Sequence, residues 1–200
     1  MKKFLSLVLA LVMTMSLVTV SAGAKDFSDD DSITYQEAVD VISEIGVVDG
    51  YTGGDFKPTD VLTRGAAAKI ICNLILGPTT ASALSASSAP FKDVPVSNTF
   101  AGYITYCAQE KIINGYPDGT FRPDRNVTRA ELMAMINRAT GRAPKSADAF
   151  LPGMKTWIDN TSDKWYYLDV QEATNSHSYT VKGSETWTAL TSDPNWSLYE

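Results

Sequence analysis

Two arginines at predicted helix starts are the residues of this chain whose type and spacing favour chemistry with a ligand. Arg64 follows Thr63 and Arg129 follows Thr128, so the two Thr-Arg pairs lie 65 residues apart. The positive end of the helix dipole disfavours a cation at a helix start by roughly a few tenths of a kcal/mol, so folding alone does not require arginine there. A guanidinium binds a carboxylate through two parallel hydrogen bonds, and the free amides of a helix start add donors. The two arginines therefore predict sites for a carboxylate, such as a pyruvyl or uronate group.

Each arginine follows a stretch that the chain carries twice. Residues 50–58 read GYTGGDFKP and residues 115–123 read GYPDGTFRP, and the two coincide at the 65-residue offset without a gap. Self-similarity at a fixed period is typical of repeat proteins. Pro-Asp-Gly in the second copy predicts a tight turn, because proline presets φ and glycine accepts the positive φ that follows. Phe56 and Phe121 are expected to fold back over a small core.

Two tyrosines and two further cations stand at equivalent places in these turns. Tyr51 and Tyr116 can offer a ring face and a hydroxyl to a sugar, and Lys57 and Arg122 add positive charge to the same groove. The alternative is that the tyrosines pack within the turns and that the cations are solvated.

The first helix of each copy precedes its turn. Thr34 and Glu37 have the Ser/Thr-x-x-Glu spacing of a capping box, so a helix is expected to start there, and Gly46 supplies a left-handed stop. Apolar residues at helical spacing predict one buried stripe on this helix, and the second copy has an equivalent stripe. The stripes are Ala38, Val41, Ile42 and Ile45, and Tyr103, Ile104, Cys107 and Ala108.

The second helix of each copy follows its turn. Thr128 and Glu131 form a second capping box, which accounts for Glu131, whereas the first copy has Ala66 in place of the glutamate. Its helix is expected to start more weakly, by about 0.3–1 kcal/mol. The apolar faces are Ala67, Ile70, Ile71 and Leu74 in the first copy and Leu132, Met135, Ile136 and Ala139 in the second.

A third copy begins but is not completed. Trp157-Ile158-Asp159 resembles a repeat opening and residues 165–173 a first helix, but no turn and no Thr-Arg follow. The tail, with Trp187 and Trp196, is expected to form a strand-like flap or a partly disordered end. The predicted organisation is a signal peptide (1–24), repeat 1 (25–77), an Ala/Ser/Thr-rich linker (78–90) in which a short helical extension is the alternative, repeat 2 (91–142), a degenerate partial repeat 3 (143–181) and a tail (182–200).

The first 24 residues have the layout of a secretory signal peptide. Two lysines precede an apolar run over 4–20, and Ala-Gly-Ala follows at 22–24, so cleavage is expected before Lys25. A membrane anchor is the alternative. Removing this segment, which holds two lysines and no acid, changes the formal net charge from −6 to −8. A protein surface with this negative charge repels nucleic acid, so an anionic ligand must be captured by a few local cations.

Cysteine and histidine usage predicts no cofactor and no metal site. Cys72 and Cys107 permit one disulfide in an exported protein, but the repeat register places Cys107 opposite Ile42, which favours a buried thiol. His177 is the only histidine, which argues against zinc. The sequence holds no nucleophile elbow and no P-loop, so a non-catalytic protein is expected, with glycan cleavage by two carboxylates as the remaining enzymatic alternative.

The turns and the Val-Thr-Arg-Ala-Glu that follows the second one resemble the signature of the S-layer homology (SLH) repeat. The resemblance implies a mainly α fold, in which helix-loop-helix repeats pack as a pseudo-threefold bundle with the third repeat incomplete. It implies an exported module at the cell wall or S-layer that binds a secondary cell-wall polysaccharide or a peptidoglycan-linked anionic glycan, often pyruvylated. It also favours Arg64 and Arg129 as ligand contacts over a structural pair with an acid of the neighbouring repeat, such as Asp55 or Asp118. The alternative function is a structural module on the same scaffold that has lost polysaccharide binding and contacts a cell-surface protein.

Overall fold

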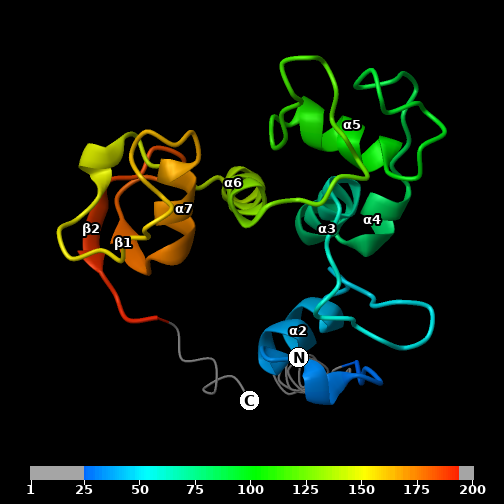
Figure 1. Cartoon of the computed structure of the whole chain (residues 1–200), viewed down its shortest axis with the longest axis horizontal. Helices are drawn as coiled ribbons and strands as arrows, with labels where there is room; N and C mark the ends of the chain where they lie inside the picture. Colours follow the sequence, from blue (N-terminus) through cyan, green and yellow to red (C-terminus); the bar gives the residue numbers. More distant parts are fainter. Residues whose placement is uncertain (1–24, 194–200) are drawn as a thin grey trace, which may run out of the picture.

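The structure is a computed structural model that describes residues 25–193, and in this part of the chain the fold is mainly helical, as predicted (Figure 1). No helix in residues 25–193 is long and apolar enough to span a bilayer. The elements are the helices α2 (Gln36–Glu44), α3 (Arg64–Leu76), α4 (Pro78–Ser82), α5 (Ala101–Gln109), α6 (Arg129–Thr140) and α7 (Tyr167–Thr174), the 3-10 turns η1 (Asp30–Ser32) and η2 (Ala147–Ala149), and the strands β1 (His177–Tyr179) and β2 (Trp187–Leu190).

The second helix of one repeat packs against the first helix of the next. The second helix of repeat 1, α3, packs against α5, the first helix of repeat 2, and α6 packs in the same way against α7, the first helix of repeat 3. The two second helices, α3 and α6, also contact each other. Among the described residues, α2 packs closely against no other helix. Repeats 1 and 2 therefore each pack their second helix on the first helix of the repeat that follows.

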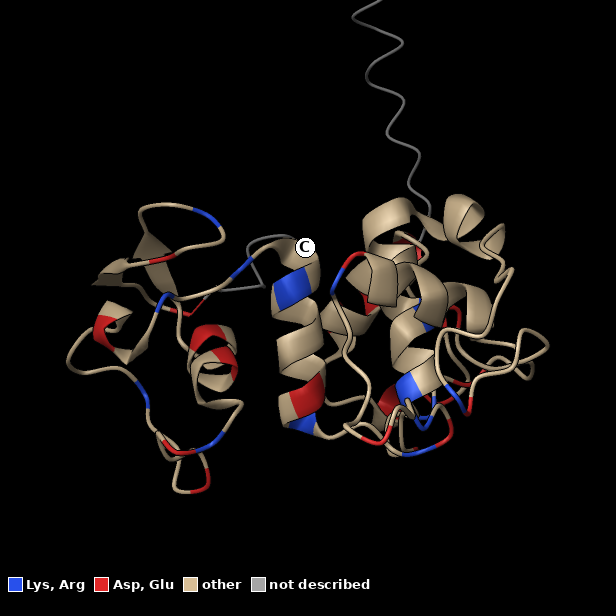
Figure 2. Ribbon diagram, turned by 90° about the horizontal axis from the view of Figure 1, so that it is seen from above, with Lys and Arg blue, Asp and Glu red and all other residues tan. Residues whose placement is uncertain are grey.

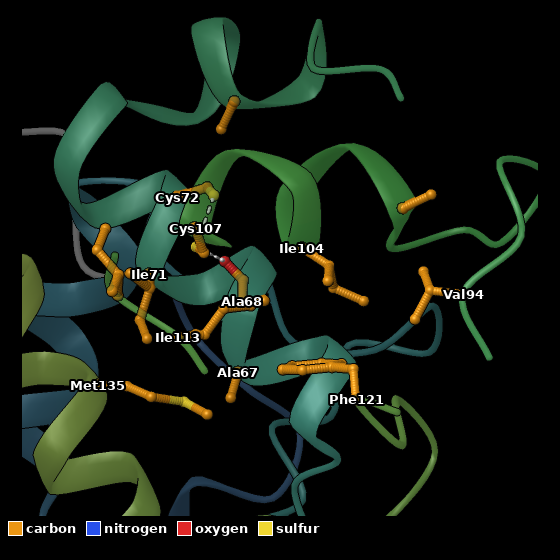
Figure 3. Packing of buried hydrophobic residues seen from close by; sticks show 13 residues of the cluster. Ala67, Ala68, Ile71, Cys72, Val94, Ile104, Cys107, Ile113, Phe121 and Met135 are labelled. Carbon is orange, nitrogen blue, oxygen red and sulfur yellow. Dashed lines mark hydrogen bonds between the residues drawn. The ribbon is translucent and has the colours of Figure 1, made fainter. Parts of the chain in front are cut away.

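The main core lies where α3, α5 and the second turn meet (Figure 3). Phe121 is completely buried and stacks on Phe91 with the ring centroids 5.4 Å apart, which confirms that it folds back over the core. Cys72 and Cys107 are buried thiols whose Sγ atoms lie 3.5 Å apart. The hydrogen bond between the Cys107 and Cys72 thiols, together with burial, raises the pKa of Cys107. These cysteines thus act as small apolar residues between the repeats.

The predicted caps are confirmed for the second helices. Thr128 accepts from the Glu131 amide while the Glu131 side chain accepts from the Thr128 amide. Thr63 keeps half of this arrangement and accepts from the Ala66 amide at 3.3 Å. Gly46 has φ of 72° and ends α2, also as predicted. The capping residues therefore place both arginines at the first position of their helices.

The predictions for the first helix were wrong in two respects. Thr34 does not cap α2, which begins at Gln36 after Tyr35, and the Gln36 side chain instead bonds Asp30 and Asp40. The predicted core stripe is not buried, and Val39 is the apolar residue of α2 that is buried, in a separate small cluster with Phe27 and Ile33. The stripe lies on the surface because no helix packs on that side of α2.

The segment predicted as a linker begins with helix α4. Pro78 stands at its first position, where a missing amide costs nothing, and Ala81 is fully buried against α3. The alternative of a short helical extension is therefore the one that the structure shows, and irregular chain follows α4 up to Phe91.

Repeat 3 aligns with repeat 2 at an offset of 66 residues. The Cys72 thiol donates to the carbonyl of Tyr103, and the equivalent Asn137 donates at 2.9 Å to the carbonyl of Asp169. At this offset Trp157 corresponds to Phe91, and Val170 to the buried Ile104. Repeat 3 therefore has a normal opening and first helix.

A β-hairpin takes the place of the third turn and its helix. Strands β1 and β2 pair antiparallel, so the described part of the tail supplies one strand of a hairpin, and the predicted boundary at 181/182 falls within that hairpin; Trp196 lies outside the described residues. Glu172 and Glu185, both with fully buried carboxylates, bind Arg142, and the Trp187 indole donates to Glu172 at 2.9 Å. His177 stacks on Trp187 with 4.0 Å between the ring centroids. These ion pairs fasten the hairpin to the end of α6.

We expect the core of repeat 2 to carry more of the stability than that of repeat 1. Phe121→Ala should lower the free energy of unfolding by about 3–5 kcal/mol, because it empties a fully buried site. Phe56→Ala removes a half-buried ring at the equivalent place and should cost less. Urea unfolding followed by circular dichroism measures both, and an equal loss in the two variants would contradict the expectation.

Candidate functional site

An aspartate near the start of each repeat holds the turn of the same repeat. Asp29 accepts from the amides of Phe56 and Lys57 at 2.7 and 2.8 Å, and Asp93 accepts from those of Phe121 and Arg122 at 2.8 and 2.7 Å. The hydrogen bond from the Phe56 amide is the main reason that the pKa of Asp29 lies below its usual value. Lys57 has a φ of 58° and Arg122 has a φ of 60°, so both turns have a residue in the left-handed conformation at the same position. The two loops, residues 49–62 (loop 1) and 114–127 (loop 2), therefore have the same backbone design.

Arg64 crosses from repeat 1 into loop 2 and is buried there. Its Nε donates to the Phe121 carbonyl at 2.9 Å, and its guanidinium lies 4.5 Å from the Phe121 ring centroid and 5.0 Å from that of Tyr116. Its backbone amide donates to the carbonyl of Arg125 at 2.9 Å, so the start of α3 and the loop share main-chain bonds as well. Only 3% of Arg64 is exposed, and it joins the two repeats.

Glu131 is the acid that pairs with Arg64, so the acid is neither Asp55 nor Asp118. Its Oε1 lies 3.1 Å from Arg64 and 2.8 Å from Arg125, and it accepts from the Tyr116 hydroxyl at 2.9 Å. Burial raises the pKa of Glu131, but the Thr128 amide, Arg125, Tyr116 and Arg64 outweigh it and lower the pKa to about 2. The cap residue predicted from the sequence thus also neutralises a buried cation.

The other predicted residues of the turns lie near the surface. Arg122 bonds Asp118 at 2.9 Å and lies over the Tyr116 ring at 4.2 Å. Loop 1 carries the equivalent pair, with the Lys57 ammonium 4.7 Å from the centroid of Tyr51. Figure 2 shows charged residues of both signs gathered in loops at one end of the helices. The structure thus brings Arg64, Tyr116 and Arg122 together, and keeps Tyr51 and Lys57 as a separate pair.

Arg129 has a different environment from its repeat equivalent. It is exposed at the first position of α6, and among residues 25–193 no group forms a hydrogen bond or ion pair with its side chain. Arg64 is satisfied by the loop of the next repeat, but the chain after α7 forms a hairpin instead of such a loop. Arg129 therefore keeps all of its guanidinium donors free.

A cleft of about 590 Å³ lies beside Arg129, between the start of α6 and repeat 3. Trp157 and Asp159, which line it, stand where Phe91 and Asp93 hold loop 2 in repeat 2. The cleft is thus the place of the missing third loop. Its lining residues are Thr128, Arg129, Ala130, Met133, Trp157, Asp159, Asn160, Tyr166, Val170 and Thr174.

The two arginine sites also differ in how closely the neighbouring helix approaches. A Cβ on Gly65 would lie 2.5 Å from the Phe100 ring, so only glycine lets this ring close over the start of α3. At the equivalent contact α6 has Ala130 and repeat 3 has Tyr166, both of which line the cleft. The open site at Arg129 therefore has alanine, Ala130, at the position where the closed site at Arg64 has glycine, Gly65.

Sequence reasoning found both arginines but not what separates them. It missed Glu131 as an ion-pair partner, because the capping box already explained that residue. It also missed Asp29 and Asp93 as turn clamps, although their 64-residue spacing in the two repeat openings was a signal. Trp157, Asp159 and Tyr166 become visible as cleft residues only once repeat 3 is aligned through α7.

The lowered pKa of Glu131 predicts an acid-sensitive contact between the repeats. Its folded pKa of about 2 lies below its ordinary value of 4.5, so its contribution is complete above about pH 5 and is lost as the pH falls toward 2. Glu131→Gln should lower the free energy of unfolding at pH 7 by about 2 kcal/mol and by much less at pH 3. Urea titrations at both pH values measure this, with the exposed Glu110→Gln as the control. An equal loss at both pH values would refute it.

Comparison with known proteins gives the family of the repeats. The model of the S-layer homology domain matches residues 26–68 and 90–133. A cellulosome-anchoring protein of Acetivibrio thermocellus is 48% identical over 119 residues, which are 58% of this chain and 25% of that protein. A surface layer protein of Brevibacillus choshinensis is 30% identical over 146 residues, which are 72% of this chain and 13% of that protein. The match thus spans a quarter or less of these relatives. Both repeats of this chain belong to the S-layer homology family.

Proposed function

We propose that this chain is a non-catalytic module that holds a protein on the cell surface by binding an anionic wall polysaccharide in the cleft beside Arg129. The observation that carries the proposal is the free guanidinium of Arg129 at the edge of this cleft. The surface-layer and anchoring relatives support the same role at the cell surface. Because the chain matches only part of these relatives, its own ligand is inferred from the site.

The cleft offers the groups that an acidic sugar needs. The Arg129 fork can bind the carboxylate of a pyruvyl ketal or a uronate in two hydrogen bonds, and the first amides of α6 lie at the same helix start. Trp157 is 44% exposed and Tyr166 half-buried, so both present ring surface to the C–H face of a sugar. The Asp159 carboxylate and the side-chain oxygen of Asn160 can accept hydrogen bonds from hydroxyl groups, since the Asn160 amide already donates to Tyr167 and Gln171. The ligand class is therefore a glycan with a carboxylate substituent.

Arg64, Tyr116 and Arg122 have a smaller part in this proposal. Arg64 is buried and fully paired, so a ligand cannot reach its guanidinium without breaking the contact between repeats. The exposed Arg122 over Tyr116 and the Lys57–Tyr51 pair remain candidate secondary contacts. The main site thus shifts to Arg129, with Trp157 and Tyr166 as its aromatic walls.

The second candidate is a module that keeps the scaffold but contacts a protein in place of the polysaccharide. The structural use of Arg64 and the replacement of the third loop by a hairpin favour it. It predicts that walls stripped of their polysaccharide still retain the protein. The first candidate predicts that the same treatment releases it.

Co-sedimentation with purified cell walls tests the assignment of Arg129. Arg129→Ala should weaken binding roughly tenfold and leave the thermal midpoint within about 2 °C, because the side chain has no partner in the described structure. The exposed Lys69→Ala is the matched control for charge. Unchanged binding by Arg129→Ala would refute the site, and no binding to pyruvylated walls by the parent protein would refute the function.

Arg64→Ala separates the two arginines. It should lower the free energy of unfolding by about 3 kcal/mol, because it leaves the Glu131 carboxylate with one cation fewer in a partly buried place. Denaturant unfolding measures this. A stable Arg64→Ala protein that fails to bind walls would show that both arginines serve the ligand.

A further inference from the structure

A stripe of apolar side chains on α2 lies open on the surface. Tyr35 is 77% exposed, Val41 43% and Ile45 55%. These residues lie on one face of the helix with Ala38 and the half-buried Ile42. An amphipathic helix places such a face against a partner, and among residues 25–193 no other helix packs closely on α2.

In repeat 2 the residues equivalent to Tyr35, Val41 and Ile42 are buried or half-buried, whereas Glu110, the equivalent of Ile45, is exposed. Cys107 on α5 corresponds to Ile42 and is completely buried against Cys72 of α3. The α7 helix is covered in the same way by α6, with Asn137 bonded to the carbonyl of Asp169. In both cases the cover is the second helix of the preceding repeat. Repeat 1 has no preceding repeat in the described chain, so its first helix stays uncovered.

Loop 1 repeats the arrangement that receives Arg64 in loop 2. The carbonyls of Asn114 and Phe121, which accept from Arg64, correspond to those of Asp49 and Phe56. In the structure the Lys25 ammonium donates to the Asp49 carbonyl, so this place already holds a cation. The loop thus retains a cation-binding backbone without an arginine from a preceding helix.

The charges of loop 1 are also complementary to an incoming cation. Residues 49–60 contain three acids and one base, which are Asp49, Asp55, Asp60 and Lys57. Asp60 stands where loop 2 has Arg125, and it is exposed. Repeat 1 has Ala66 where repeat 2 has Glu131, so here the acid is on the loop and not on the helix. An arginine entering loop 1 would therefore still meet a carboxylate.

We propose that α2 and loop 1 together form a docking surface for the second helix of an S-layer homology repeat carried by another polypeptide. The helix that fits begins with Thr-Arg, places its arginine in loop 1 and lays an apolar face on Tyr35, Val41 and Ile42, with Ile45 at the edge of the contact. The contact reproduces those of α3 with α5 and α6 with α7. It uses none of the residues of the main polysaccharide site beside Arg129, and of the secondary contacts only Tyr51 and Lys57 lie in loop 1, so binding at Arg129 and binding at α2 are tested separately.

A second copy of this chain is a poorer occupant. Its two second helices, α3 and α6, are already packed against α5 and α7. A copy could supply such a helix only by opening one of these contacts. The partner is therefore a repeat whose second helix is not already covered.

A synthetic peptide with the sequence of residues 126–142, which contains Thr128-Arg129 and the α6 face, serves as the probe. Fluorescence anisotropy of the labelled peptide should show saturable binding to the protein. The double variant Val41→Asp, Ile45→Asp should weaken binding by at least about tenfold, since it puts two charges on the apolar face. A peptide with Arg129→Glu should weaken it to a similar degree, and Asp60→Asn in the protein by about threefold.

The double variant Val96→Asp, Ile158→Asp is the matched control. Both residues are exposed apolar side chains outside α2, so peptide binding should stay within about twofold. Thermal melts show that each variant folds. The proposal is wrong if the peptide does not bind at about 1 mM, or if the α2 variant binds it as well as the control. It is also wrong if sedimentation of the protein alone shows a dimer that the α2 variant abolishes, because a second copy then covers the stripe.

Discussion

The contact on which the described structure depends is a buried arginine that one repeat places into the loop of the next. Arg64 gives up water, and loop 2 compensates with the Phe121 carbonyl and two aromatic rings, while α6 supplies the Glu131 carboxylate. A buried charge is tolerated only when it is paired and hydrogen-bonded in this complete way. This requirement ties loop geometry, helix cap and repeat packing together. The Asp93 clamp sets the loop backbone, and the Thr128 cap positions Glu131.

The same requirement explains why equal residues in the two repeats have unequal roles. Arg64 and Arg129 share a threonine cap and a helix position, so their sequence contexts are nearly identical. They differ in the segment that the next repeat places beside them. Arg64 contacts loop 2 of repeat 2, whereas repeat 3 has a hairpin in place of the loop that Arg129 would contact. A guanidinium that finds carbonyls and a carboxylate becomes part of the scaffold, whereas one that does not remains available to a ligand. The division between structure and function is therefore set by the neighbouring repeat.

This dependence also marks how far the sequence could predict the structure. Local signals were sufficient where the cause is local: the Thr128 cap, the Gly46 stop and the return of Phe121 over the core all appear as expected. The amphipathic pattern of α2 correctly indicated an apolar face but not its burial, because burial needs a partner that the pattern does not contain. The cleft at Arg129 was beyond prediction for the same reason. Its walls, Trp157 and Tyr166, come from a repeat whose alignment depends on the packing of α6 on α7.

An acidic protein that captures an acidic polymer must do so at short range. With a formal charge of −6, the chain repels such a polymer, and salt largely screens this repulsion beyond about one Debye length, which is about 8 Å at physiological ionic strength. A cation without an internal partner then retains its full attraction at the surface, whereas Arg64 and Arg125 both lie in ion pairs with Glu131. Asp159 in the same cleft further limits the attraction to ligands whose carboxylate reaches Arg129 and whose hydroxyl groups meet Asp159. The charge pattern thus selects for the position of the carboxylate on the sugar more than for the total charge of the polymer.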